Sequence, residues 1–410
     1  MTVPVRTRAL ISTALALAMV AVVTGPAGAA QPAEPAPPAS PGVDFGLSHR
    51  PVCPPAPDFA ARCHADVVTA AGGQPLATTS YANGYTPAQL ASAYKLVGAG
   101  SATQTVAIVD AYDNPNAESD LAVYRSRFGL PACTTANGCF RKVDQRGGTA
   151  YPRGDTGWGQ EIALDVDMAS AVCPGCNILL VTADSSSFAD LAAGVDRAAA
   201  MGATAISNSY GGREFSTEAS WETHYNHPGV AITVSSGDSG YGAEFPAASR
   251  YVTAVGGTSL TPSSSARGWS ETVWSGAGSG CSAYIVKPSW QVDTGCSRRT
   301  VADVAAVADP ATGVAVYDSY GSSGGANWYV FGGTSVASPI VAAVYALAGN
   351  ATTIGPSYPY AHTASLFDVT SGSNGRCTSR KTSQAQYLCT GTAGYDGPTG
   401  NGTPNGTGAF

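Results

Sequence analysis

The chain has 410 residues, of which 44% are hydrophobic, so it is long enough to bury one large core or two ordinary ones. Charged residues make up only 12%, about half of the usual share of roughly 25%. The net charge of −7 and the absence of any Lys/Arg run argue against nucleic acid as a partner.

The N-terminus has the order of a secretory signal peptide. Arg6 and Arg8 precede an apolar run at 9–23, and small residues follow at 27–29. A membrane anchor is the alternative, but the run is shorter than the about 20 apolar residues of a membrane span. We therefore expect residues 1–30 to be removed and the protein to be secreted into the extracellular space, with no membrane attachment afterwards.

Ten cysteines favour the same environment, because disulfides persist in oxidising compartments. They occur as neighbours along the chain, and local pairing is the simplest interpretation. The motif Cys173-Pro174-Gly175-Cys176 could also be a redox motif or half of a zinc site, but no second CxxC or His pair completes such a site. The expected pairs are Cys53/Cys63, Cys133/Cys139, Cys173/Cys176, Cys281/Cys296 and Cys377/Cys389.

The composition changes along the chain and suggests its domain organisation. A Pro/Ala-rich stretch at 31–57 predicts a linker or arm, which we extend over 31–80, and a single domain at 81–410 follows. Within that domain, apolar strands alternate with helices, which predicts an α/β fold whose parallel sheet is covered on both faces. The expected strands are 105–109, 177–182, 205–208, 230–235 and 251–255, and the expected helices are 117–128 and 188–201.

Two carboxylates stand out in the apolar stretch GQEIALDVDMA at 159–169. Glu161 and Asp165 are four residues apart and therefore share one face of a helix. Burial and a neighbouring carboxylate both raise a carboxyl pKa, and such a coupled pair can share a proton and work as an acid/base unit in acid. A solvated acidic face explains this stretch equally well.

A third acid follows the predicted strand at 230–235, in the sequence SSGDSG. Asp238 comes directly after the strand, and open α/β sheets place their sites at the carboxyl ends of strands. An Asx-type turn residue is the simpler alternative for a single acid among glycines and serines.

A serine opens the apolar helix expected at 335–348, in the sequence GGTSVASP. The hydroxyl of Ser335 would lie near free backbone N–H groups that favour a developing oxyanion. A helix N-cap is the alternative interpretation. A nucleophilic serine also needs a base, and no histidine occurs in a His-Gly-Thr-like motif. The histidines are His49, His64, His224, His227 and His362.

Together these motifs resemble the sedolisin family, the serine-carboxyl peptidases with a subtilisin-like fold. The matching stretches are Glu161-x-x-x-Asp165 followed by VDMASAVCPG, then SGDSG at 236–240, and Gly-Thr-Ser-x-x-Ser-Pro at 333–339. The resemblance covers about residues 81–410. It implies a subtilisin-like parallel sheet flanked by helices, with Ser335 as nucleophile, Glu161 as general base and then acid, Asp165 as its orienting partner and Asp238 as oxyanion donor.

The resemblance also implies a function. We expect a secreted endopeptidase that hydrolyses proteins or peptides at acidic pH, because a carboxylic acid donates a hydrogen bond only while protonated. The arm at 31–80 is too short for the long prodomain of the family. A histidine-dependent serine peptidase and a catalytically silent secreted binding protein are the alternatives. Nothing in the sequence demands more than a monomer.

One calcium ion is implied near the C-terminus. Asp368 and Asp396 would give side-chain oxygens, and Val369, Thr392 and Gly394 would give carbonyls. Such an all-oxygen set suits a hard cation. An ordinary Asp/Gly-rich turn is the alternative.

Two further segments are implied to lie beside the site. Asp110 ends the strand TVAIVD and would lie next to the Glu161/Asp165 pair. The stretch at 208–212 (NSYGG) resembles the segment whose backbone pairs with substrate in subtilisin-like enzymes, and a strand-end turn is the alternative.

Overall fold

The computed structural model of this chain describes residues 1–2, 48–70, 72–81, 83–320, 326–377 and 383–410. Apart from residues 1–2, the expected signal peptide lies outside the described residues, and so does the first part of the arm at 31–47. The chain divides into two compact units, Met1–Pro38 and Ala39–Phe410, and the described helices and strands all belong to the second. Within the described ranges, none of the helices combines the length and the apolar character that a membrane crossing requires.

The centre of the second unit is an eight-stranded sheet in the order β12-β11-β9-β7-β4-β6-β5, with β15 also paired to β11. Every pairing in it is parallel except that of β12 with β11. This confirms the predicted α/β fold. The strands are β4 (Thr105–Ala111), β5 (Phe140–Asp144), β6 (Asn177–Ala183), β7 (Ala205–Asn208), β9 (Ala231–Ser235), β11 (Thr253–Pro262), β12 (Trp269–Val273) and β15 (Val304–Val307).

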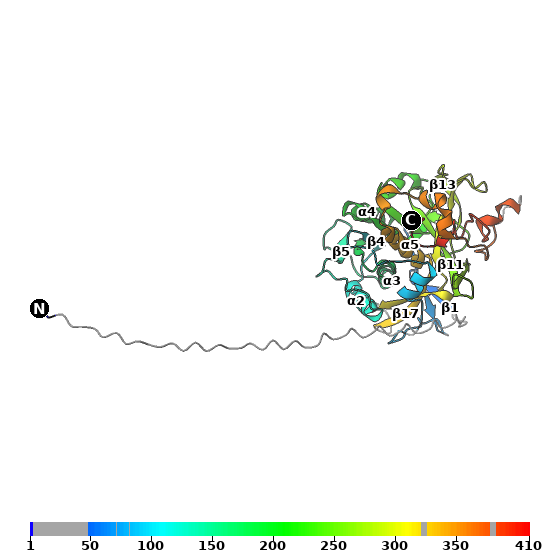
Figure 1. The fold of residues 1–410 in the computed structure, drawn as a ribbon. Helices are drawn as coiled ribbons and strands as arrows, with labels where there is room; N and C mark the ends of the chain where they lie inside the picture. Colours follow the sequence, from blue (N-terminus) through cyan, green and yellow to red (C-terminus); the bar gives the residue numbers. More distant parts are fainter. Residues whose placement is uncertain (3–47, 71, 82, 321–325, 378–382) are drawn as a thin grey trace. The chain divides into compact units, whose positions relative to one another are not determined.

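Helices cover both faces of the sheet (Figure 1). Val106 and Ile108 of β4 belong to the apolar cluster that includes α3 (Thr156–Val172) and α5 (Thr334–Ala348). The alternate residues of the same strand belong to a second cluster, which includes α4 (Phe188–Ala200). Because both faces are buried, the strands read as continuous apolar runs rather than alternating ones.

The chain before residue 81 takes part in this fold. It forms β1 (Ser48–Pro51), β2 (Arg62–Cys63) and β3 (Asp66–Thr69). One small sheet has the order β1-β3-β17-β16 and another has the order β10-β8-β2. The folded unit therefore includes residues that the composition assigned to the arm. The sequence did not predict these strands, because strands of two to four residues are too short to show a periodic pattern. The partner strands are β8 (Tyr210–Arg213), β10 (Glu244–Phe245), β16 (Val314–Asp318) and β17 (Asn327–Gly332).

The other elements are short or lie outside the main sheet. All five expected disulfides are present, so the local pairing is confirmed and the CxxC motif is a disulfide. The remaining helices and strands are α1 (Pro87–Ala93), α2 (Ala117–Arg127), α6 (Tyr358–Ala361), β13 (Gly280–Val286), β14 (Arg298–Val301), β18 (Leu366–Phe367) and β19 (Thr403–Pro404).

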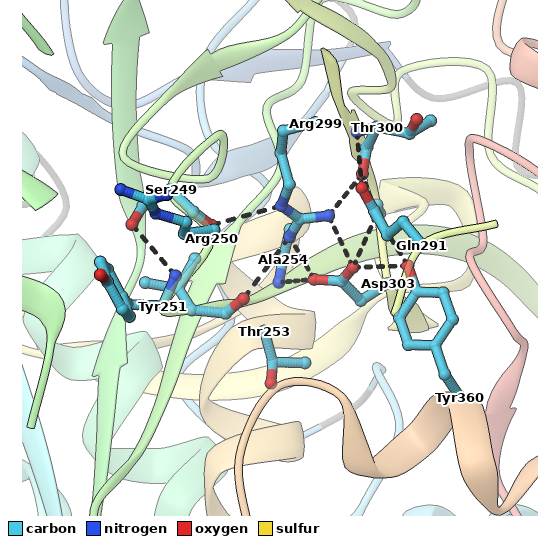
Figure 2. A network of polar contacts seen from close by, with 12 residues as sticks. Ser249, Arg250, Tyr251, Thr253, Ala254, Gln291, Arg299, Thr300, Asp303 and Tyr360 are labelled. Atoms are coloured by element: carbon cyan, nitrogen blue, oxygen red, sulfur yellow. Dashed lines mark hydrogen bonds and ion pairs between the residues drawn. The ribbon is translucent and has the colours of Figure 1, made fainter. Parts of the chain in front are cut away.

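A buried ion pair links β14, through Arg299, to the main sheet, through Asp303 and Ala254 of β11 (Figure 2). Arg299 and Asp303 are both fully buried, and two bonds of 2.7 and 2.5 Å link the guanidinium to the carboxylate. The carboxylate also accepts the Ala254 amide at 2.7 Å and the Tyr360 hydroxyl at 2.7 Å. The guanidinium donates further to backbone carbonyls, among them that of Ser249. Each charge is thus surrounded by partners, which is the condition for keeping a charge pair inside a protein.

Candidate active site

Helix α3 carries two carboxyl groups into the core. Asp155 caps it by accepting the amides of Gly157 and Trp158 at 3.0 and 3.1 Å. Glu161 and Asp165 are both fully buried. The solvated acidic face is therefore the wrong interpretation, and the helix presents both acids to the interior near the ends of the parallel strands.

A third carboxyl group joins them from β4. Asp110 is fully buried, and within the described part of the chain none of the oxygens of Asp110, Glu161 and Asp165 has a hydrogen-bond partner. Burial raises the pKa of Asp110 to about 8. The pKa of Glu161 is raised by burial first and then by Asp165 and Asp110, and burial followed by Asp110 raises that of Asp165. We call these three residues the carboxyl cluster. Because their pKa values are raised, these carboxyl groups hold protons at acidic pH.

Ser335 is the second residue of α5 and is fully buried. Its hydroxyl donates to the carbonyl of Ser209 at 3.1 Å, and the cap of the helix is Gly333, so the N-cap interpretation is wrong. The hydroxyl lies near enough to Glu161 to lower the pKa of that carboxyl, although no hydrogen bond of normal length joins them.

Asp238 follows β9 and contacts the residue before Ser335. Its Oδ1 accepts both the amide and the hydroxyl of Thr334, at 2.8 and 2.7 Å. These partners are 96 residues away, so Asp238 is no local turn residue. Burial raises its pKa to about 7, and His64 acts in the opposite direction. In acid the carboxyl is therefore protonated, and because Oδ1 already accepts two hydrogens, the proton belongs on Oδ2.

Gly333 leaves room for the carbonyl group of His64 beside Asp238. Its φ is +95°, and an added Cβ would overlap the carbonyl oxygen of His64 and lie 2.7 Å from Asp238 Oδ2. The amide of Ser335 donates to the same carbonyl oxygen at 3.3 Å. The His64 carbonyl oxygen thus accepts the Ser335 amide, and Asp238 Oδ2 lies on the same side of Gly333. An amide and a carboxylic acid that both donate at such a position can stabilise an oxyanion.

The structure therefore brings Ser335, Glu161, Asp165 and Asp238 into one site, with Asp110 beside them. Sequence reasoning missed Thr334, although it stands directly before the serine in the Gly-Gly-Thr-Ser motif. It also missed His64 and Glu244, which join residues 180 positions apart in the chain and leave no local pattern. Of the segment at 208–212, Ser209 contacts Ser335 and the following residues form β8.

The two elements expected to hold calcium lie together. The amide of Gly394 donates to Asp368 Oδ2 at 2.9 Å, and that of Thr392 donates to Asp396 Oδ2 at 3.1 Å. Burial, together with the charge of Asp368, raises the pKa of Asp396 to about 7. In the described ranges no three His, Cys, Asp or Glu side chains gather as metal ligands, so carbonyl oxygens such as that of Val369 would complete the set. Two carboxylates that repel each other suit a hard cation, whose protein ligands are oxygens.

Comparisons with known proteins agree with this geometry. Residues 148–364 match the subtilase family. Kumamolisin of Bacillus sp. (strain MN-32) is 32% identical over 340 residues, which cover 74% of this chain. Sedolisin of Pseudomonas sp. (strain 101) is 34% identical over 209 residues, which cover 43% of this chain. The matches span 58% and 33% of those two relatives' own lengths.

A solved structure of Pseudomonas sedolisin, complexed with two molecules of pseudo-iodotyrostatin, superposes with a TM-score of 0.64 at 27% identity. The superposition covers 80% of this chain and 96% of that one. A lanthipeptide protease has the same fold at 13% identity and a TM-score of 0.50, over 78% and 91% of the two chains. The chain thus has a subtilisin-like α/β fold, and it belongs to the subtilase family and, within it, to the sedolisins.

Proposed function

We propose that this protein is a secreted serine-carboxyl endopeptidase that hydrolyses peptide bonds of proteins at acidic pH. The observation that carries the proposal is the buried Ser335 hydroxyl near Glu161, together with Asp238, which contacts Thr334 next to the serine and whose raised pKa keeps it neutral in acid. Sedolisin, named a serine-carboxyl proteinase, supports it by fold and identity.

A histidine-dependent mechanism has little support. His64 contacts the Ser335 amide through its carbonyl, but its side chain bonds to Ser235 at 2.7 Å and to Glu244 at 3.0 Å rather than to the Ser335 hydroxyl. A glutamate base also suits acid better, since an imidazole would be protonated there and could not accept the serine proton.

Each residue of the site has a proposed role. Once the carboxyl cluster has lost one proton, ionised Glu161 takes the proton of Ser335 as Oγ attacks the substrate carbonyl, and protonated Asp165 stabilises that charge. Asp238 Oδ2 and the Ser335 amide donate to the oxyanion. Glu161 then returns the proton to the leaving nitrogen, and water completes the hydrolysis in the same way.

The environment of the enzyme is part of the proposal. Five disulfides suit an oxidising compartment, which supports secretion. The partners are protein or peptide substrates, with neither nucleic acid nor a membrane, and we propose a monomer. A structural calcium ion would be held by Asp368, Asp396 and the carbonyls of Val369, Thr392 and Gly394. Such an ion neutralises the two carboxylates and ties the segments that carry them together.

Hydrolysis of denatured casein between acidic and neutral pH tests the mechanism. We expect activity only in acid, and a loss of about 10⁴-fold or more in kcat for both Ser335→Ala and Glu161→Gln, because members of a nucleophile–base unit fail together. Circular dichroism of both variants checks that they fold. Activity that peaks near neutral pH and survives Glu161→Gln would exclude the carboxyl mechanism, and no cleavage by folded wild-type protein would favour the silent binding protein.

A further inference from the structure

Two glutamates lie together where the chain leaves β8. Glu214 follows that strand directly, and Glu218 begins a short helix at Glu218–Ser220. Glu218 is fully buried and Glu214 is partly buried. Oε2 of Glu218 accepts the Phe215 amide at 2.9 Å, whereas its Oε1 is buried and has no hydrogen-bond partner among the described residues. A buried polar atom without a partner destabilises a fold, so a partner for this oxygen is expected.

A proton on Glu218 supplies the missing hydrogen bond. The Glu218 carboxyl lies within hydrogen-bond reach of Glu214, and two carboxyl groups can bond to each other only when one of them is protonated. Burial first, then the charge of Glu214 and the hydrogen bond to it, raises the pKa of Glu218 to about 9. Protonated Glu218 therefore donates to Glu214 in acid, and that proton holds the pair together.

Glu214 extends this contact to β13. Its Oε1 accepts the Ser282 hydroxyl at 2.5 Å, and its Oε2 accepts the Ala283 amide at 2.9 Å. Both of these donors belong to β13, whereas Glu218 belongs to the helix that follows β8. The two glutamates thus connect segments that are more than 60 residues apart in the chain.

The other charged groups around the pair already have partners. Glu222, on the next short helix, also raises the pKa of Glu218, but it accepts the Arg250 amide at 2.8 Å and lies 3.2 Å from the guanidinium of the same residue. His224 of that helix pairs with Asp196 of α4 at 2.7 Å. The sequence of β13 contains no charged residue. The proton is therefore what offsets the repulsion between the two glutamates.

The segments that the pair connects also reach the candidate active site. β8 comes directly after Ser209, whose carbonyl accepts the Ser335 hydroxyl. Shortly before β13, the amide of Gly278 donates to the carbonyl of Gly237 at 2.7 Å, and Asp238 is the next residue. The pair therefore links the segment beside the serine to the segment beside Asp238.

We propose that Glu214 and Glu218 form a pH-sensitive latch, which holds β8 and β13 together while a proton lies between the two side chains. Loss of that proton leaves two negative charges facing each other at a buried position, and their repulsion opens the latch. The inference goes beyond the proposed function, because it concerns the segments that flank the site and requires no chemical step.

The direction of the pH effect follows from the raised pKa. The folded state binds the Glu218 proton more tightly than the unfolded state does. The contribution of the latch is therefore complete below the ordinary pKa of 4.5, declines as the pH rises above it, and is lost at about pH 9. An acidic environment is where the latch stabilises the fold most.

Hydrogen exchange tests the latch locally, in full-length Ser335→Ala protein so that the chain cannot digest itself. The Ala283 amide is the reporter, because it donates to Glu214. After correction for the intrinsic exchange rate, we expect its protection to fall at least about tenfold between pH 5 and pH 9. Adding Glu218→Gln should preserve the protection, because an amide donates to Glu214 without titrating.

Glu118→Gln is the charge-matched control. Its carboxylate accepts the amide and the hydroxyl of Thr135 rather than bonding to another acid, so this variant should lose protection at Ala283 as the parent does. Protection that is independent of pH in the parent, or that falls equally in Glu218→Gln, would overturn the latch. Either result leaves the proposed function standing, since no catalytic activity enters the measurement.

Thermal melting in the same background is the second test. We expect Glu218→Gln to match the parent at pH 5 and to melt at least about 3 °C higher at pH 9. If Glu218→Gln does not fold, Glu214→Gln should reduce the pH dependence as well, because it removes the charge that faces Glu218. A folded variant with the same melting temperature as the parent at both pH values would overturn the latch.

Discussion

Two groups of fully buried ionisable side chains use opposite arrangements in this domain. Arg299 and Asp303 neutralise each other and have hydrogen bonds from several directions (Figure 2). The carboxyl cluster of Asp110, Glu161 and Asp165 contains only acids, whose oxygens have no hydrogen-bond partner in the described structure. The first group balances one positive charge against one negative charge, whereas the second avoids charge by holding protons.

The difference shows where stability and reactivity are located. A saturated ion pair fixes neighbouring strands and has no free group for chemistry. An unsaturated acid cluster destabilises the fold once it ionises, but its protons can be exchanged with a bound substrate. Four measurements test this contrast, and the ion pair should give the largest effect.

Breaking the saturated pair should strongly reduce stability. Asp303→Asn leaves the Arg299 charge buried without a counterion, and we expect the free energy of unfolding to fall by about 3–5 kcal/mol. Chemical denaturation measures this. The double variant Arg299→Met/Asp303→Leu should recover most of the loss, because it removes both charges together. A single variant as stable as the wild type would mean that water reaches the Arg299 guanidinium.

Removing the proton donor at the site should mainly affect the rate. Asp238→Ala deletes one oxyanion donor, and we expect kcat to fall by about 10²–10³-fold. Asp238→Asn is the informative comparison, since an amide donates without titrating. Its remaining activity should no longer fall as the pH rises through about 7, where Asp238 loses its proton. A wild-type rate for Asp238→Ala would remove Asp238 from the mechanism.

Asp368 and Asp396 are a pair of acids that a bound cation would turn into a charge-balanced group. Without a cation the two acids repel each other, and a bound calcium ion would neutralise them. We expect added calcium at 100 times its Kd to raise the free energy of unfolding by about 2.7 kcal/mol, and a chelator to reverse this. Asp368→Asn should weaken the response. A melting temperature that is indifferent to both additions would exclude the site.

In acid, the replacement of Asp110 in the carboxyl cluster should have the smallest effect on stability. The pKa of Asp110 is raised from its ordinary 3.8 to about 8, so the folded state binds the proton more tightly than the unfolded state. Its stabilising contribution is complete below about pH 4 and is lost as the pH rises through about 8. Asp110→Asn should therefore change stability by less than about 1 kcal/mol at pH 4 and stabilise at pH 8. A variant with an unchanged slope of melting temperature against pH would contradict this.

Local patterns explain how much of the molecule was predictable. The parallel sheet follows from apolar runs such as β4 and β6, because strands buried on both faces carry their signal in their own residues. Glu161 and Asp165 were found because a four-residue spacing on an apolar helix is itself the signal. Glu244 could not be found, since its importance comes from His64, 180 residues earlier in the chain. The small sheet of β3 and β17 was missed for the same reason.

The same distinction between local and distant contacts applies to the disulfides. Their sequence separations are 10, 6, 3, 15 and 12 residues, and no loop encloses or overlaps another. Each cysteine therefore pairs with the next one made or with the one made just before it. Oxidation in the order of synthesis gives the native set directly, so this chain has little need of an isomerase to correct its bonds.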